Sequence, residues 1–375
     1  MTTTADLLFA PRTMLQAVLK MDTPSLFLKQ TFFPIFEQVE TLNIELDEII
    51  GDKTMAGYSH PQGQTAMVQK QGFKNKIWTP AFVNQGVEIN AYEVASQRVP
   101  GQTVYEATNI INNATKMLGT ELIKLSNMIT RREEHACSEI LKTGKLHIYG
   151  GGEDRVIDFE MPNSHKITLT GDDLFTSANS DPAKILDDIC TLVGRNPENY
   201  LGAPDIAVLG RNVASAFLSH TKVIGQESRF NNLGINMGQI APNKKEDKVR
   251  YIGDVRIINS IQIFYYAETY QDDKTKVVYD IMDPNYIYLG KSESLNRFVN
   301  AGIADLDAGT NNVSDPNYIR DIVNVNQVKT TNIVATPRYP KTWRQHNPSA
   351  QMLALQSSFL PLLLYPASFA SVKAT

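Results

Sequence analysis

One long, uninterrupted helical pattern near the middle of this chain constrains its fold more than any other feature. Apolar residues recur three or four positions apart over 103–143, which predicts an amphipathic helix of about 60 Å at a rise of 1.5 Å per residue. Thr103 and Glu106 have the spacing of a capping box, and Gly144 offers a stop. A helix this long with one narrow apolar stripe needs an extended surface to cover it. We expect it to lie across a β-sheet, with a coiled-coil dimer as the alternative.

The sequence on both sides of this helix has the pattern of strands and turns. The segment 51–90 is punctuated by glycines and has too few large apolar residues for a core of its own, which predicts a two-stranded excursion that rests on a neighbour. Gly150, Gly151 and Gly152 predict a hairpin turn directly after the helix. Further helices are predicted over 182–192 and 211–219, a buried strand over 206–209, and consecutive antiparallel strands over 249–258, 261–270 and 276–282. The chain is therefore expected to be an α+β protein.

Composition narrows the class of protein further. A chain of 375 residues with 42% hydrophobic residues can bury a large core, and a net charge of -4 does not indicate a polyanion-binding protein. Two cysteines are too few for a disulfide framework, which is typical of a reducing cytoplasm. The most apolar stretch, 359–365, is far shorter than the ~20 residues that cross a bilayer, so we expect no membrane span.

The sequence contains no strong catalytic pattern. Its six histidines are scattered singly, without metal-ligand spacing. The glycines at 150–152 lack the Gly-Lys-Ser/Thr that follows in a phosphate-binding loop. We therefore expect no enzyme activity, no metal and no cofactor, with a hydrolase or oxidoreductase that uses this glycine-rich region as the least favoured alternative.

Two short runs of sequence carry a resemblance to a known family. The first is Arg338-Tyr339-Pro340-Lys341-Thr342-Trp343, followed by an apolar strand that ends in Ser-Phe-Ala-Ser-Val. The second is Trp78-Thr79-Pro80-Ala81-Phe82-Val83. Both resemble the lambda-type phage major capsid proteins, the E family. In that resemblance Thr79, Pro80, Val83, Arg338, Tyr339, Pro340, Lys341 and Trp343 have structural roles.

The resemblance implies a Hong Kong 97-type capsid fold. It places an N-terminal arm at 1–50, an extended β-loop at 51–95, a peripheral domain at 97–180 with a spine helix over 103–143, an axial domain at 181–324, and a return to the peripheral domain with closing strands at 325–375. The implied function is that of the major head protein of a tailed double-stranded DNA phage. Such a chain assembles in the host cytoplasm as hexamers and pentamers, and the icosahedral shell of the virion encloses DNA without sequence-specific binding.

The resemblance also indicates partners. These are copies of the same chain, a scaffolding protein, a portal and a decoration protein. An encapsulin-like bacterial compartment shell of the same fold is the second hypothesis.

Contacts between subunits are expected from two charged segments and two aromatic residues. The acidic segment contains Glu37, Glu40, Glu45, Asp47 and Glu48, and the basic segment contains Lys70, Lys74 and Lys76. They either complement each other between subunits or form two solvated faces. Trp78 and Phe82 either anchor the loop on a neighbour or pack within their own subunit. Arg338 and Tyr339 are interpreted as a packing corner.

Overall fold

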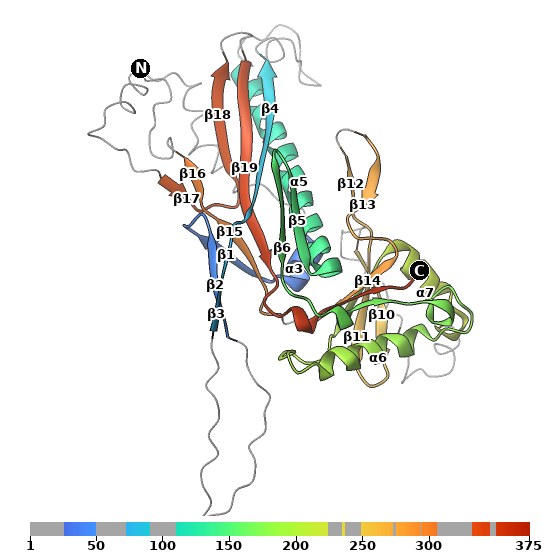
Figure 1. Cartoon of the computed structure of the whole chain (residues 1–375). Coiled ribbons are helices and arrows are strands. Elements are labelled where there is room, and N and C mark those ends of the chain that lie inside the picture. The colour runs from blue at the N-terminus through green and yellow to red at the C-terminus, as the bar shows by residue number, and fades with distance from the viewer. Residues whose placement is uncertain are drawn as a thin grey trace, which may run out of the picture.

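The computed structural model describes residues 26–49, 73–90, 110–223, 235–236, 249–272, 275–292, 294–305, 332–345 and 350–375. A five-stranded and a seven-stranded sheet are joined by the long helix α5 (Figure 1), which confirms the α+β class. In chain order the elements are α3 (Phe27–Phe32), β1 (Ile35–Val39), β2 (Ile44–Ile49), β3 (Phe73–Trp78), β4 (Ala81–Asn90), α5 (Ile110–Thr143), β5 (Lys145–Gly150), β6 (Glu153–Asp158), η2 (Asn163–His165), β7 (Lys166–Thr168), η3 (Gly171–Asp173), α6 (Pro182–Arg195), β8 (Ile206–Leu209), α7 (Arg211–Ser219), β9 (Ile235–Asn236), β10 (Val249–Arg256), β11 (Ser260–Tyr266), β12 (Thr269–Gln271), β13 (Val278–Asp280), β14 (Tyr286–Gly290), β15 (Arg297–Ala301), β16 (Ile303–Asp305), β17 (Asn332–Val334), β18 (Tyr339–Gln345), β19 (Ala350–Leu362), η4 (Pro366–Ser368) and β20 (Ala370–Lys373).

The helix α5 lies across the five-stranded sheet, as its apolar stripe predicts (Figure 1). In that sheet β19 is central, with β4 along one edge and β18 and then β15 along the other, and β1 continues beyond β15. Leu118, Leu122, Leu125 and Ile129 of α5 are buried against apolar residues of β4 and β19. The stripe is therefore covered by a sheet of the same chain. The predicted start of the helix, at Thr103 and Glu106, lies outside the described residues.

The C-terminal end of α5 is where the sequence placed it. Gly144 has φ = 71° and donates its backbone N–H to the carbonyl oxygen of Ile140 at 2.7 Å. A β-carbon at this position would overlap the side chain of Met161, so only glycine fits. The chain then turns directly into the hairpin of β5 and β6, whose two-residue loop, Gly151 and Gly152, has positive φ at both positions.

The segment before α5 divides between two partners. Strand β3 pairs with β2 in a separate hairpin, whereas β4 pairs with β19 along ten residues, from Ala81 to Asn90. Only the first of these two strands therefore belongs to a two-stranded excursion. The expected boundary between arm and loop at residue 50 falls inside the hairpin, because its two strands lie on opposite sides of that residue.

The seven-stranded sheet has the order β7-β20-β14-β8-β11-β10-β9. Side chains alternate along its strands, as a two-sided sheet requires. In β8, Ala207 and Leu209 face the cluster formed by α6 and α7, whereas Ile206 and Val208 face the cluster that contains the end of α5. Strand β20 comes from the end of the described chain and β7 from before α6, so this sheet combines residues from three of the segments that the resemblance separates.

The consecutive antiparallel pairing predicted over 249–282 is confirmed, but the predicted middle strand, 261–270, is divided into β11 and β12. Strands β10 and β11 pair antiparallel, but the other neighbour of β11 is β8, in parallel. Strands β12 and β13 form a hairpin of their own. The all-buried strand β8 takes the interior position in the sheet because its four apolar residues fit between two covered faces, whereas β13 has largely exposed residues.

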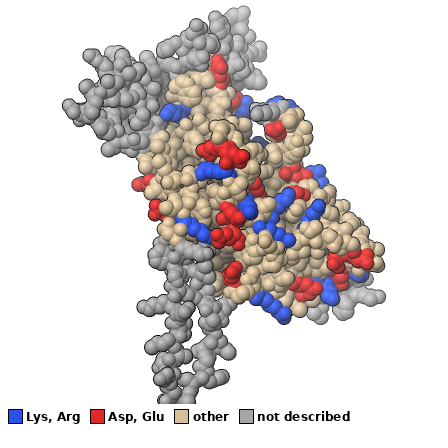
Figure 2. All heavy atoms as spheres, in the orientation of Figure 1, with Lys and Arg blue, Asp and Glu red and all other residues tan. Residues whose placement is uncertain are grey.

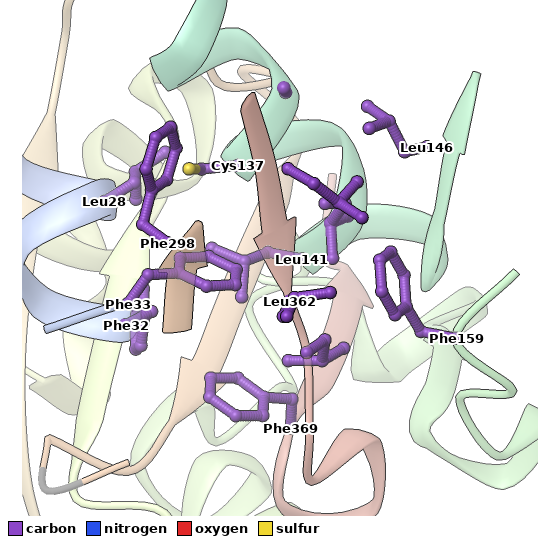
Figure 3. Close-up of a cluster of buried hydrophobic side chains, with 14 of the residues drawn as sticks. Leu28, Phe32, Phe33, Cys137, Leu141, Leu146, Phe159, Phe298, Leu362 and Phe369 are labelled. Atoms are coloured by element: carbon purple, nitrogen blue, oxygen red, sulfur yellow. The ribbon is translucent and has the colours of Figure 1, made fainter. Parts of the chain in front are cut away.

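The largest buried cluster joins the two sheets (Figure 3). It contains Phe32 of α3 and Phe33 directly after it, Cys137 and Leu141 of α5, Phe298 of β15, Leu362 of β19, and Phe369 just before β20. Phe298 stacks on Phe359 at 5.7 Å between ring centroids. Segments that are far apart in the sequence are therefore held together by one core.

Candidate interaction surfaces

The predicted acidic and basic segments lie side by side in the β2–β3 hairpin. The register places Glu48 opposite Lys74 and Leu46 opposite Lys76. The ammonium group of Lys76 forms an ion pair with Glu160 at 3.1 Å, and Glu45 is exposed. The side chains of Asp47, Glu48 and Lys74 are not described, and Lys70 lies outside the described residues. Acidic and basic residues thus occupy facing positions in the backbone register of this hairpin.

The remaining two acidic candidates lie at β1. Glu37 accepts a hydrogen bond from the guanidinium of Arg297 at 2.8 Å, across the parallel pair of β1 and β15. Glu40 is exposed in the turn that follows β1. Glu37 is thus partly exposed and paired within the chain, and Glu40 is the more exposed of the two.

The two aromatic candidates have different surroundings. Trp78 is half-buried, and its ring lies 5.7 Å from that of Phe159 in the same chain. Phe82 is 49% exposed and lines an open groove beside α5. Contacts within the subunit therefore cover much of the Trp78 side chain, whereas Phe82 has a large surface available for a partner.

The Thr79-Pro80 run forms the corner between β3 and β4. Arg155 of β6 donates its guanidinium N–H groups to the carbonyl oxygens of Thr79 at 2.9 Å and Pro80 at 2.5 Å. The Thr79 hydroxyl donates to the side-chain oxygen of Asn43 at 3.1 Å. Val83 packs against two buried clusters, both of which include residues of α5. These contacts fix the point at which the hairpin leaves the sheet.

Arg338 is a buried junction at the start of β18. Its guanidinium donates to the carboxylate of Glu133, to the hydroxyl of Thr130 at 3.1 Å, and to the hydroxyl of Ser357 at 3.2 Å. Beside it Tyr339 and Pro340 are buried, Lys341 is half-buried and Trp343 is 43% exposed. The guanidinium thus connects α5, β18 and β19.

Sequence reasoning missed two buried acids on α5, Glu133 and Glu134. Glu133 accepts from the ammonium group of Lys29 at 2.7 Å in addition to Arg338, and together these cations hold the pKa of Glu133 below its usual value against the effect of burial. Glu134 accepts from the backbone N–H groups of Leu28 at 2.8 Å and Lys29 at 3.2 Å, and from the hydroxyl of Tyr266 at 2.9 Å. Burial raises the pKa of Glu134 to about 7. The two carboxylates hold α3 on α5.

An open groove of about 1150 Å³ runs beside α5, between the β5–β6 hairpin and the β12–β13 hairpin. Its lining includes the exposed apolar side chains of Phe82, Met128, Tyr149 and Val278. Arg132 lies over the ring of Tyr149 at 5.4 Å, and His135 meets the ring of Tyr270 edge-on at 5.5 Å. The groove offers aromatic and apolar surface with a few charged groups.

The described surface carries mixed charge. On the face shown in Figure 2, acidic and basic side chains are interspersed. Across the described ranges, His, Cys, Asp and Glu side chains form no group of three or more that could hold a metal ion. Both cysteines are buried, and burial raises the pKa of each thiol. Within the same ranges no helix combines the length and apolarity needed to cross a membrane.

The comparisons with known proteins agree with this architecture. A protein assigned as the capsid protein of a prophage of Escherichia coli CFT073 matches with a TM-score of 0.66 at 15% identity, over 98% of this chain and 99% of that one. A phage-related protein of Bordetella bronchiseptica RB50 matches with a TM-score of 0.50 at 13% identity, over 97% of each chain. An encapsulin complex from Synechococcus elongatus reaches only 0.47 at 9% identity, over 95% of this chain and 93% of that one. No curated protein matches the sequence significantly.

Fold and comparisons define the class first: the chain has the Hong Kong 97-type fold of capsid proteins, as the resemblance implied. The family model for phage major capsid protein E matches residues 10–374, and the chain belongs to that family. Family and fold imply a structural role in the virion capsid, through self-association into a shell.

Proposed function

We propose that this chain assembles in the host cytoplasm, as hexamers and pentamers, into the icosahedral head of a tailed phage and encloses its double-stranded DNA. A scaffolding protein, a portal and a decoration protein are the further partners that we propose. Support comes from the β2–β3 hairpin, which forms a two-stranded sheet separate from the two large sheets (Figure 1) and leaves Ile77 60% exposed. Obligate assemblies bury large interface areas between their subunits, and an exposed hairpin supplies such area.

The domain roles follow from the same proposal. Residues 1–50 act as the arm, 51–95 as the extended loop, 97–180 with the return at 325–375 as the peripheral domain, and 181–324 as the axial domain. The long helix α5, laid on β4 and β19, supports the assignment of a spine helix. The mixed surface charge supports enclosure of DNA without a sequence-specific grip.

We further propose that the charged hairpin contributes to contacts between subunits. Glu40, Glu45 and the exposed ring of Phe82 are directed to solvent in the isolated chain, so a neighbour can reach them. Trp78 contributes less to this contact between subunits, because Phe159 already covers part of its ring. Charge complementarity of this kind is screened by salt, so assembly should weaken as ionic strength rises.

Electron microscopy of the purified chain, with and without a scaffolding protein, tests the proposal. Shells, hexamers or pentamers are expected, and uniform monomers under all salt and scaffold conditions would overturn it. Replacing Lys70, Lys74 and Lys76 together by glutamate should reduce shell formation and its salt dependence. Unchanged assembly of this variant would remove the charge hypothesis and leave the shell proposal standing.

A further inference from the structure

The turn between β10 and β11 has an unusual chemical character. Arg256 pairs with Ser260, which leaves a three-residue loop of Ile257, Ile258 and Asn259. Turns normally consist of Gly, Pro, Asn, Asp and Ser, each for its backbone geometry or local hydrogen bonds. Here two of three residues are isoleucines, and they are 50% and 80% exposed. The hairpin therefore presents apolar side chains at its tip.

The backbone of this loop is fixed by a buried carboxylate. Asp187 of α6 is only 2% exposed, and one of its oxygens accepts the backbone N–H groups of Ile258 at 3.2 Å and Asn259 at 2.8 Å. The side-chain amide of Asn259 donates to the same oxygen at 3.1 Å and to the hydroxyl of Thr191 at 3.1 Å. The loop is thus ordered by α6 without help from its two isoleucines.

This order has a consequence for binding. A loop that is already held in one conformation loses little conformational entropy when a partner covers it, so more of the apolar contact remains as net affinity. Buried isoleucine contributes favourable free energy by leaving water, and it gives no attraction to phosphate groups. The tip therefore suits a protein surface and not the packaged DNA.

We propose that Ile257 and Ile258 form an apolar contact between one copy of this chain and a second copy. The inference rests on the proposed shell function, because in a shell each subunit is surrounded by copies of itself. This apolar loop tip is repeated on every subunit and adds one contact per copy. Many such contacts act together in the assembled shell. Next to the loop tip, Arg256 and Asp254 of β10 form an ion pair at 2.9 Å, so charged groups lie beside the two isoleucines.

The double variant Ile257→Ser with Ile258→Ser tests this contact. Serine is a normal turn residue, and the hydrogen bonds that Asp187 and Thr191 accept from this loop come from the Asn259 side chain or from backbone N–H groups, so the fold should be retained. We expect the concentration needed for assembly to rise at least tenfold while the thermal midpoint of the unassembled chain stays unchanged. The matched control is Leu218→Ser, which removes one exposed apolar side chain from α7.

Thiol labelling gives a second measurement. The chain has only two cysteines, both buried, so a cysteine at position 258 (Ile258→Cys) is the accessible thiol. We expect full labelling of unassembled chains, protection in shells, and failure of prelabelled chains to assemble. Assembly of the double variant at the wild-type concentration, an equal loss in the Leu218 control, or free labelling in shells would each overturn this contact. Wild-type chain that never assembled would remove the shell proposal as well.

Discussion

The two faces of the seven-stranded sheet are buried in different ways. The face toward α6 and α7 is covered by apolar side chains such as Leu209, Ile263 and Leu289. The opposite face meets α5 and α3, and there the strands contribute Tyr266 and Tyr288, whose hydroxyls are hydrogen-bonded to Glu134 and Ser138. The face toward α6 and α7 is thus held mainly by apolar side chains, whereas the face toward α5 and α3 also contains buried polar groups whose hydrogen-bond geometry selects one arrangement.

The buried acids of α5, which contact both sheets, should make the fold sensitive to loss of one charge. Arg338→Ala leaves Glu133 buried with Lys29 as its remaining cation, so we expect the free energy of unfolding to fall by about 4 kcal/mol. Urea denaturation of the unassembled chain measures this loss. Arg338→Lys is the control, since it keeps the charge and loses the fork of donors. A loss below about 1 kcal/mol in the alanine variant would show that the junction contributes no more than a surface pair.

The apolar face should respond to a cavity instead. Leu289→Ala removes a fully buried side chain from β14 and is expected to lower the free energy of unfolding by about 3 kcal/mol. Because no titratable group of this cluster depends on Leu289, the loss should be the same at pH 5 and pH 8. Denaturation at both pH values tests this, and a pH-dependent loss would contradict the contrast between the two faces.

The pH dependence of stability should report the polar face through Glu134. Its pKa of about 7 lies above the ordinary value of 4.5, so the folded chain takes up a proton that the unfolded chain does not bind in this range. The contribution of this group is therefore fully present below pH 4.5 and is lost as the pH rises through 7. Relative to Glu134→Gln, the wild type should gain on the order of 2 kcal/mol between pH 7 and pH 5.

The stability contribution of the neighbouring His135 changes with pH in the opposite direction, so the wild type has to be compared with Glu134→Gln. Burial lowers the pKa of His135 to about 4, so the contribution of this residue is lost as the pH falls below the ordinary value of 6.5. Glu134→Gln retains His135, and subtraction isolates the carboxyl group. A difference between the two proteins that did not change with pH would show that Glu134 keeps an ordinary pKa.

Local sequence signals predicted much of the fold. The end of α5 at Gly144, the hairpin at 150–152, the helix over 211–219 and the strand over 206–209 all follow from residues close to each other in the chain. The resemblance led to the correct family. Its two motifs form corners of the fold, of which one is held by Arg155 and the other by Arg338.

Pairings between distant segments could not be predicted in the same way. The pairing of β8 with β11, and the position of β20, depend on competition among strands of similar composition. The buried acids did leave a signal: Glu133 occupies a position of the α5 stripe, four residues after Ile129 and three before Ala136, where an apolar residue was expected. Its partners, Lys29 and Arg338, are too far away in the sequence for the pattern to reveal them.

The position of β20 has a consequence for the timing of synthesis. This strand lies between β7 and β14, so an interior place in the sheet waits for residues that leave the ribosome long after both neighbours. Until then β7 lacks the only strand with which it pairs in the described sheet, and one edge of β14 is open. Because domains fold as their residues emerge, a nascent chain cannot complete this sheet early. Completion of this sheet therefore waits until residues 370–373 have been translated.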